Sequence, residues 1–268
     1  MREARTTGHV EGELIQGGTT VFRRICAALL AMANTRCCYS AAGAVAPLPA
    51  GGLQVLFIGN SLTYVNDLPR TLSDLALTTG DTIRTESVTF PDFALVDHLN
   101  EGSAVRAIRS TAWHVVVLQQ GPSSLQANRD SLIAMTRLFD VSIKQIGGKT
   151  ALFGVWPQTV NYSTFPRAIE SYRLAAQAIN GVYLSVGAAW QSALSQDATL
   201  PLYSGDGLHP ATLGTYLAAL VMYERLTGKD PRQLSATAIV EGRVLAGVSE
   251  NTVRKLQGIA HATNALVR

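Results

Sequence analysis

Short apolar runs alternate with longer amphipathic segments over most of this chain. The first run, residues 53–58, stops at Gly59, and its length and composition are typical of a strand buried on both faces of a parallel sheet. The pattern predicts four further strands. They lie at 82–89, 114–118, 150–155 and 182–186.

The segments between the predicted strands have the apolar spacing of helices. Helices are expected at 66–79, 95–110 with an interruption at Gly102, 128–146, 165–179, 187–195 and 211–226. Alternating strands and helices favour a five-stranded parallel sheet with helices on both faces, and right-handed crossovers make this a three-layer α/β/α sandwich. Residues from about 232 to 268 are interpreted as two further helices, which either cover a sheet edge or form a partner surface.

The composition narrows the classes of function. With 268 residues the chain is long enough for one sizeable domain. The formal net charge is +3 and no run of Lys or Arg occurs, which argues against a nucleic-acid partner. All three cysteines, Cys26, Cys37 and Cys38, precede the predicted domain. A disulfide framework, a zinc site and a cysteine nucleophile are therefore excluded from that domain, and no metal or cofactor is expected.

The N-terminal segment differs from the rest of the chain. Residues 1–20 are polar and aperiodic, and they are expected to be disordered. Residues 21–46 contain two arginines before an apolar run, with Ala42-Gly-Ala44 as a candidate cleavage site. This pattern predicts a secretory signal peptide, too short to span a bilayer, and hence a secreted or periplasmic protein; a short amphipathic helix is the alternative. Residues 47–52 are rich in Pro and Gly and are expected to link into a domain at 53–268.

A serine stands directly after the first predicted strand. Gly59 and Asn60 break the apolar run, and both residue types tolerate the backbone angles of a sharp turn. The turn leaves Ser61 at the carboxyl edge of the sheet, where ligands bind in open parallel sheets. A helix N-cap is the alternative role for a serine at such a position.

An aspartate and a histidine lie three residues apart near the other end of the domain, in Ser204-Gly-Asp-Gly-Leu-His-Pro210. A serine hydroxyl is a poor nucleophile unless a base takes its proton, and His209 is the candidate base. Asp206 would hold the imidazole in the required tautomer and stabilise the imidazolium that forms. The alternative is a solvated loop in which Asp206 only forms a turn.

These two segments resemble the conserved blocks of a known family. Gly59-Asn-Ser-Leu-Thr63 resembles the first block of the SGNH/GDSL hydrolases, and Asp206-Gly-Leu-His-Pro210 resembles their last block. The resemblance covers roughly residues 53–228. It implies a flavodoxin-like SGNH hydrolase fold and a serine esterase that works through a Ser61–His209–Asp206 triad and an acyl-enzyme.

The family also implies three donors for the developing oxyanion. The Ser61 backbone N–H is the first. The family adds a glycine N–H after the second strand, where this chain has no glycine, so the backbone N–H of Asp92 or Phe93 is expected to serve instead. The family's third donor is an asparagine side chain, and this chain has Gln119 and Gln120 there, as in acetylesterase branches. The two glutamines point to opposite faces if the strand continues, and Gln120 is preferred.

Residues near these blocks are candidates for the substrate pocket. Asn60, Phe93 and Trp156 follow predicted strands at the carboxyl edge, although Trp156 could equally belong to the core. Asp97 and His98 are adjacent, and side chains of adjacent residues on a helix face different ways, so they are interpreted as structural rather than catalytic.

The sequence thus predicts a serine ester hydrolase for small acyl groups such as acetyl, with a carbohydrate ester as one substrate. The expected partners are a small-molecule or carbohydrate ester, with no nucleic acid and no stable membrane span. A lipase or thioesterase for longer acyl chains is one alternative. A binding module that keeps the fold without turnover is another, because two of the oxyanion positions depart from the family.

Overall fold

The computed structural model describes residues 49–267. These described residues belong to one compact unit. The predictions for residues 1–20, for the signal peptide at 21–46 and for the start of the linker fall outside the described residues. The rest of the linker makes a turn in which the Gly52 N–H donates to the Pro49 carbonyl over 2.7 Å.

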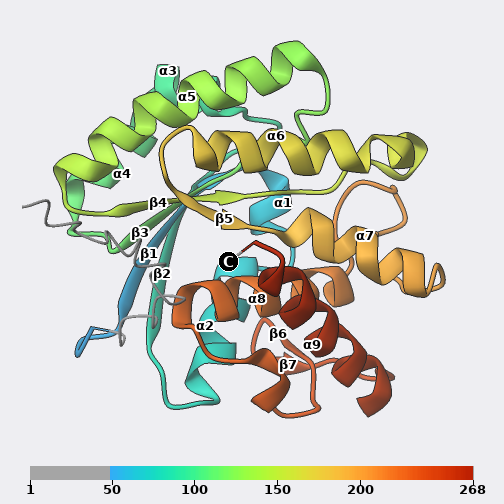
Figure 1. Cartoon of the computed structure of the whole chain (residues 1–268). Helices are drawn as coiled ribbons and strands as arrows, with labels where there is room; N and C mark the ends of the chain where they lie inside the picture. The colour runs from blue at the N-terminus through green and yellow to red at the C-terminus, as the bar shows by residue number, and fades with distance from the viewer. Residues whose placement is uncertain (1–48, 268) are drawn as a thin grey trace, which may run out of the picture. The chain divides into compact units, whose positions relative to one another are not determined.

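The centre of the domain is a five-stranded sheet in which every neighbouring pair is parallel, in the order β2-β1-β3-β4-β5 (Figure 1). This confirms the predicted sheet. Its strands are β1 (Leu53–Gly59), β2 (Ile83–Thr89), β3 (Val115–Leu118), β4 (Lys149–Phe153) and β5 (Val182–Leu184).

The strand order changes direction at β1, which lies between β2 and β3. Gly59 pairs with Thr89 on one side, and Ile58 pairs with Leu118 on the other. The three strands therefore end at nearly the same level, and the loops after them begin side by side. In open α/β sheets this switch point is where ligands bind.

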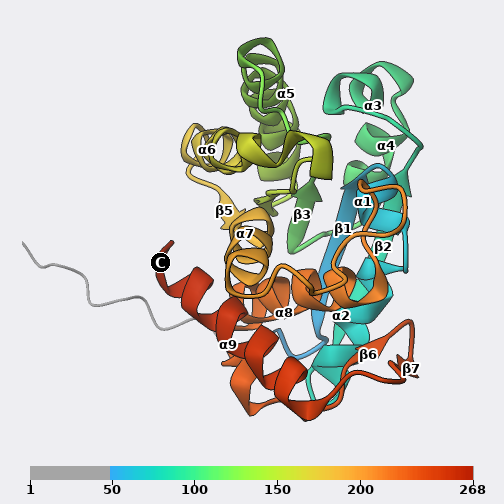
Figure 2. The ribbon, with the colours of Figure 1, turned by 90° about the vertical axis from the view of Figure 1, so that its right-hand side faces the viewer.

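Helices cover both faces of the sheet, which makes the predicted three-layer sandwich (Figures 1 and 2). On one face lie α3 (Leu95–Glu101), α4 (Ser103–Ser110), α5 (Gln126–Gln145) and α6 (Phe165–Gln177). On the other lie α2 (Leu68–Leu77), α8 (Thr212–Thr227) and α9 (Glu250–Ala265), with α7 (Val186–Gln196) against α8 and α9.

The helix predicted at 95–110 is divided, as expected, at Gly102. This residue has φ +87° and ends α3, and α4 begins at the next residue. A glycine is suited to this left-handed position because it has no Cβ. Two short helices complete the carboxyl edge: α1 (Ser61–Tyr64) and the 3-10 helix η1 (Thr159–Thr164).

The prediction of two helices over the last segment is wrong. The structure has a 3-10 turn, η2 (Pro231–Gln233), then the hairpin of β6 (Ile239–Val240) and β7 (Arg243–Val244), and only then the helix α9. Glu241 and Gly242 join the two strands with φ values of +51° and +73°, and two successive positive angles make a tight hairpin turn and interrupt a helix. The segment covers its own domain, since α9 packs on α7 and α8.

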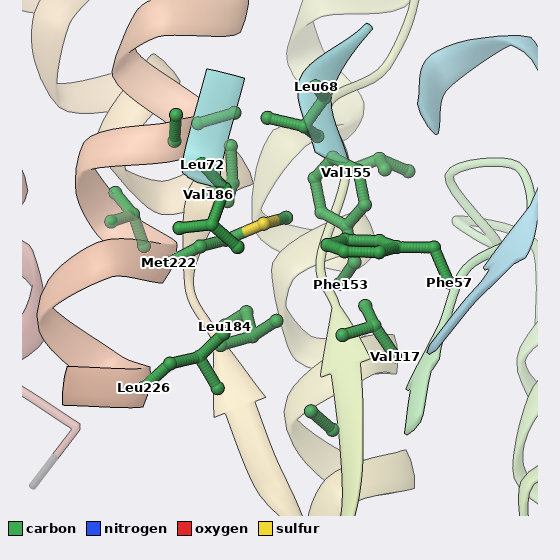
Figure 3. Packing of buried hydrophobic residues seen from close by; sticks show 14 of the residues in the cluster. Phe57, Leu68, Leu72, Val117, Phe153, Val155, Leu184, Val186, Met222 and Leu226 are labelled. Carbon is green, nitrogen blue, oxygen red and sulfur yellow. The ribbon is translucent and has the colours of Figure 1, made fainter. Parts of the chain in front are cut away.

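The core is continuous between the sheet and the layer of α2 and α8 (Figure 3). Phe57, Val117, Phe153 and Leu184 come from four different strands and are fully buried. They face Leu72 of α2 and Met222 of α8, among others. Fourteen of the sixteen residues of α8 are buried, so this helix is a central element rather than a surface cover.

Candidate active site

Ser61 is the first residue of α1 and follows β1 after a single residue, Asn60. Asn60 caps the helix, because its Oδ1 accepts a hydrogen bond from the Leu62 N–H over 3.1 Å. Its Nδ2 donates to the Phe93 carbonyl over 3.0 Å, which joins the turn that carries Ser61 to the loop after β2. The Ser61 N–H, at the first helical position, has no acceptor within the helix, so it can donate to an oxyanion.

Gln119 holds this turn from the loop after β3. Its Oε1 accepts from the Asn60 N–H and from the Thr63 hydroxyl, both over 2.8 Å. Its Nε2 donates to Asn60 Oδ1 over 2.8 Å and to the Gln120 carbonyl over 2.7 Å. Both amide hydrogens are used and the side chain is fully buried, so the prediction of Gln119 as an oxyanion donor is wrong. Gln119 positions the turn that carries Ser61.

Gln120 lies differently, along the cleft that contains Ser61. Its Nε2 donates to the Ser123 hydroxyl over 2.8 Å, and its Oε1 accepts from the Leu95 N–H over 3.1 Å. One of its two amide hydrogens is engaged in this way, which leaves the second for a ligand. Gln120 therefore stays the candidate side-chain donor.

Asp92, from the loop after β2, lines the same cleft. Its φ is +58°, in the left-handed region, and it belongs to the loop in which the family resemblance implies a glycine. The Phe93 N–H that follows makes a long hydrogen bond of 3.5 Å to the Phe90 carbonyl. The Asp92 N–H is therefore the better main-chain candidate for the oxyanion.

Asp206 and His209 form a hydrogen-bonded pair, with 2.5 Å between Asp206 Oδ2 and His209 Nδ1. The other oxygen, Oδ1, accepts from the N–H groups of Leu208 and His209, each over 2.9 Å, and from the Ser204 hydroxyl over 2.7 Å. The His209 ring and these further donors hold the pKa of the Asp206 carboxyl well below its usual range. An ionised carboxylate at Nδ1 places the ring proton there and leaves Nε2 as the free base.

Buried contacts fix the loop that carries this pair. Trp156 Nε1 donates to the Leu208 carbonyl over 2.9 Å, and the indole of Trp156 stacks on that of Trp190 with ring centroids 3.5 Å apart. Trp156 is fully buried, so its predicted place in the substrate pocket is wrong. Gly207 has φ +68°, and a Cβ there would lie 2.4 Å from the Thr159 hydroxyl oxygen. The loop therefore requires glycine at this position.

Asn66 ties the two halves of the site together. Asn66 lies five residues after Ser61, and Pro210 directly follows His209. Asn66 Nδ2 donates to the Pro210 carbonyl over 2.9 Å and to the Thr215 hydroxyl over 3.0 Å, so it links the segment after Ser61 to the segment after His209. Leu208 lines the same cleft as Ser61. The hydrogen bonds of the described residues do not include one from Ser61 to His209, and catalytic hydrogen bonds often tighten only when substrate is bound.

The cleft has a volume of about 680 Å³. Most of its polar lining consists of amides and hydroxyls, and the predicted pocket residues Asn60 and Phe93 both belong to it. The amide and hydroxyl residues are Asn60, Ser61, Gln120, Ser123, Ser124, Asn128, Ser131, Gln158, Asn161 and Thr164. Such a lining suits a ligand that offers several neutral hydrogen-bonding groups.

His98, which the sequence predicted to be structural, contacts the end of β1 just before the turn that carries Ser61. Its Nε2 donates to the Gly59 carbonyl over 2.8 Å, since a carbonyl can only accept. Its Nδ1 is buried and has no partner among the described residues. Burial lowers the pKa of His98. No sequence signal marked either His98 or Gln119 as a support of Ser61.

Residues 49–267 contain no group of three His, Cys, Asp or Glu side chains placed to hold a metal ion. Over the same part of the chain, no helix is both long and apolar enough to cross a bilayer.

Comparison with solved structures identifies the fold of the chain. No protein-family model matches the chain, and no curated protein matches it. Among solved structures, a candidate SGNH hydrolase from Slackia heliotrinireducens is 24% identical, with a TM-score of 0.55 over 65% of this chain and 99% of that one. A DUF4886 family protein from Bacteroides uniformis is 19% identical, with a TM-score of 0.68 over 81% and 95%.

A catalytic mutant of an acetylxylan esterase from Geobacillus stearothermophilus is 16% identical, with a TM-score of 0.51 over 65% of this chain and 94% of that one. Likenesses at this identity show the fold, which is that of the SGNH hydrolases.

Proposed function

We propose that this chain, which has the SGNH hydrolase fold, is a serine ester hydrolase with Ser61, His209 and Asp206 as its catalytic triad. The observation that carries the proposal is the Asp206–His209 pair, with its 2.5 Å hydrogen bond. That pair lies on a loop bonded to the segment after Ser61 and bordering the same cleft. The hydrogen bonds from Trp156 to Leu208 and from Asn66 to Pro210 fix this loop, whereas a turn that is only solvated would have no such bonds.

The reaction follows from these positions. His209 Nε2 takes the proton as the Ser61 hydroxyl oxygen attacks the ester carbonyl, and Asp206 stabilises the imidazolium. The N–H groups of Ser61 and Asp92 and the Gln120 amide would donate to the oxyanion, where the loss of one donor typically costs about 10²–10³ in rate. His209 then protonates the leaving alcohol, and water attacks the Ser61 acyl ester by the reverse sequence.

The substrate we propose carries a small acyl group, such as acetyl, on a polar alcohol such as a carbohydrate. The support is the lining of the cleft, in which amides and hydroxyls outnumber apolar side chains. A solved structure of the same fold is an acetylxylan esterase. A lipase or a thioesterase for longer acyl chains is the alternative among ester hydrolases.

Residues 21–46 are proposed to direct export of the protein, because two arginines precede an apolar run. Intact-mass analysis of the protein from culture supernatant or periplasm tests this. Loss of the residues up to about Ala44 supports export through a cleaved signal, whereas a retained Met1 contradicts it.

Labelling with a fluorophosphonate tests the proposed triad, because an activated serine attacks the phosphorus of such reagents, expels fluoride and becomes phosphonylated, whereas an unactivated serine does not react. Wild-type protein should be labelled, and peptide mapping should place the label on Ser61. Ser61→Ala should abolish labelling and His209→Gln should slow it at least tenfold, whereas Ser73→Ala, a serine of α2, should not change it. Absence of label on folded wild-type protein would favour a binding module instead.

A further inference from the structure

Asp92 brings a free carboxylate to the cleft. Its backbone has φ +58°, a conformation that Asp and Asn tolerate and that glycine adopts most easily. The conformation therefore does not require a charge. The side chain is exposed and makes no hydrogen bond or ion pair with any other described residue. Unlike Asp97, which caps α3 by accepting from the Ala94 N–H over 2.8 Å, Asp92 is not used to hold the loop.

Asp92 is also the one side chain with a formal charge among the residues that line the cleft within the described part of the chain. The other lining residues are neutral, and none is Lys, Arg or His. Arg129 follows the lining residue Asn128, but its guanidinium is bonded to the Ser171 hydroxyl over 2.9 Å and to the Arg167 carbonyl over 3.3 Å. No cationic side chain of the lining offsets the Asp92 carboxylate.

We infer that Asp92 selects substrates by the charge of the leaving alcohol. The site takes esters of neutral or cationic, hydroxyl-rich alcohols, such as neutral sugars and amino sugars, and disfavours esters of anionic alcohols such as uronates or sugar phosphates. This inference rests on the proposed esterase function, which it deepens. Two opposite charges about 6 Å apart in a solvent-filled cleft interact strongly enough to change an equilibrium about threefold to tenfold, and salt weakens the effect.

The physical reason is that the carboxylate acts on a fixed charge of the alcohol, away from the reacting oxygen, and this charge does not change as the acyl group is transferred. A cationic alcohol is attracted in the ground state and in the transition state alike, so the effect is expected mainly in KM and kcat/KM rather than in kcat. A purely structural Asp92 would change the rates for all esters by the same factor. The ratio of rates for charged and neutral esters therefore isolates the electrostatic role.

Two matched pairs of acetate esters test the inference. Acetylcholine and 3,3-dimethylbutyl acetate differ by a positive charge, and 4-acetoxybenzoate and its methyl ester differ by a negative charge. The kcat/KM for each ester is measured on the full chain at low and at high salt, for wild type, for Asp92→Asn and for Asp92→Gly. Glu86→Gln removes an exposed carboxylate of β2 that does not line the cleft, and it is the control for net charge.

In Asp92→Asn the kcat/KM of the cationic ester relative to its neutral partner should fall about threefold to tenfold. The kcat/KM of the anionic ester relative to its neutral partner should rise by a similar factor. Asp92→Gly also removes the carboxylate, and glycine adopts this backbone conformation most easily. It should therefore shift both ratios in the same directions as Asp92→Asn, and it replaces that variant as the test if asparagine impairs the loop. The Glu86→Gln ratios should match wild type. Ratios unchanged in both Asp92 variants overturn the inference while leaving the esterase proposal intact. A folded wild type that hydrolyses neither neutral ester overturns both.

Discussion

The side-chain amide of Gln119 bonds to the backbone and to the side chain of Asn60: it accepts from the Asn60 N–H and donates to Asn60 Oδ1, each over 2.8 Å. One residue of the loop after β3 thus sets the backbone and the side chain of the residue before Ser61. A Cβ on Gly59 would lie 2.3 Å from Gln119 Oε1, so the close approach also requires glycine there. Ser61, the proposed nucleophile, is positioned by a buried polar network rather than by its own helix of four residues.

Gln119→Ala should lower both activity and stability. The variant leaves the Asn60 N–H and the Thr63 hydroxyl buried without an acceptor, and each such group costs about 1–3 kcal/mol. Because Ser61 is displaced and the cleft is not, kcat should fall about 10²-fold with little change in KM. Chemical denaturation and steady-state kinetics measure the two effects. Gln177→Ala, an exposed residue of α6, should stay within about 0.5 kcal/mol of wild type; an unchanged kcat in Gln119→Ala would contradict the positioning role.

Gly207→Ala should disturb the loop that carries the base. The left-handed angle alone costs a non-glycine residue about 1–2 kcal/mol, and the added Cβ meets the Thr159 hydroxyl oxygen at 2.4 Å. We expect a lower kcat and a lower Tm. Gly205→Ala in the same loop is the matched control, because a Cβ there meets nothing within 4 Å. Equal kcat in the two variants would show that the loop adapts without moving His209.

The dependence of activity on pH should separate His209 from Asp206. The pKa of Asp206 lies well below its usual range in the folded protein, so its carboxylate stays ionised throughout the mildly acidic range. The contribution of this carboxylate to stability is present above about pH 4 and is lost only as pH falls through the lowered value. The rate should instead fall in mild acid, because a protonated imidazole cannot take the Ser61 proton. A rate that stays constant from about pH 8 to 5 would contradict His209 as the base.

His98 should make the protein less stable in mild acid. Burial lowers its pKa in the folded state, so the unfolded chain binds the proton more tightly. The resulting loss of unfolding free energy is absent above the pKa of the unfolded state, about 6.5. It grows as pH falls below that pKa and levels off below the lowered pKa of the folded state. Between about pH 7.5 and 5, denaturation curves should therefore show a smaller decrease in the free energy of unfolding for His98→Gln than for wild type. An equal loss in both proteins would exclude His98 as the source.

The sequence predicts the sheet and its order of elements well because buried parallel strands are continuous apolar runs, as in β1 and β3. It also predicts the break between α3 and α4, because that break requires only a glycine, Gly102, at a left-handed position. The sequence does not predict the hairpin of β6 and β7, because each strand has only two residues. Two residues are too few to distinguish the apolar–polar alternation of a strand from the apolar spacing of a helix.

The chemistry of the site is less predictable than the fold. Gln119 and Gln120 are chemically identical, and only the direction of each side chain shows that one holds Asn60 while the other faces the cleft. Trp156 follows β4 at the carboxyl edge, but Trp190 of α7 stacks on it and buries it. Such roles depend on contacts between distant segments, which local sequence patterns do not contain.

Hydrolysis of p-nitrophenyl acetate and p-nitrophenyl octanoate by wild type and Ser61→Ala tests the central claim most directly. We expect wild type to hydrolyse the acetate faster than the octanoate, and Ser61→Ala to lose about 10³-fold or more of the activity, since removing a triad member has an effect of this size. A Ser61→Ala variant that keeps wild-type activity, or a folded wild type that hydrolyses neither ester, would contradict the assignment of Ser61 as the nucleophile of an esterase.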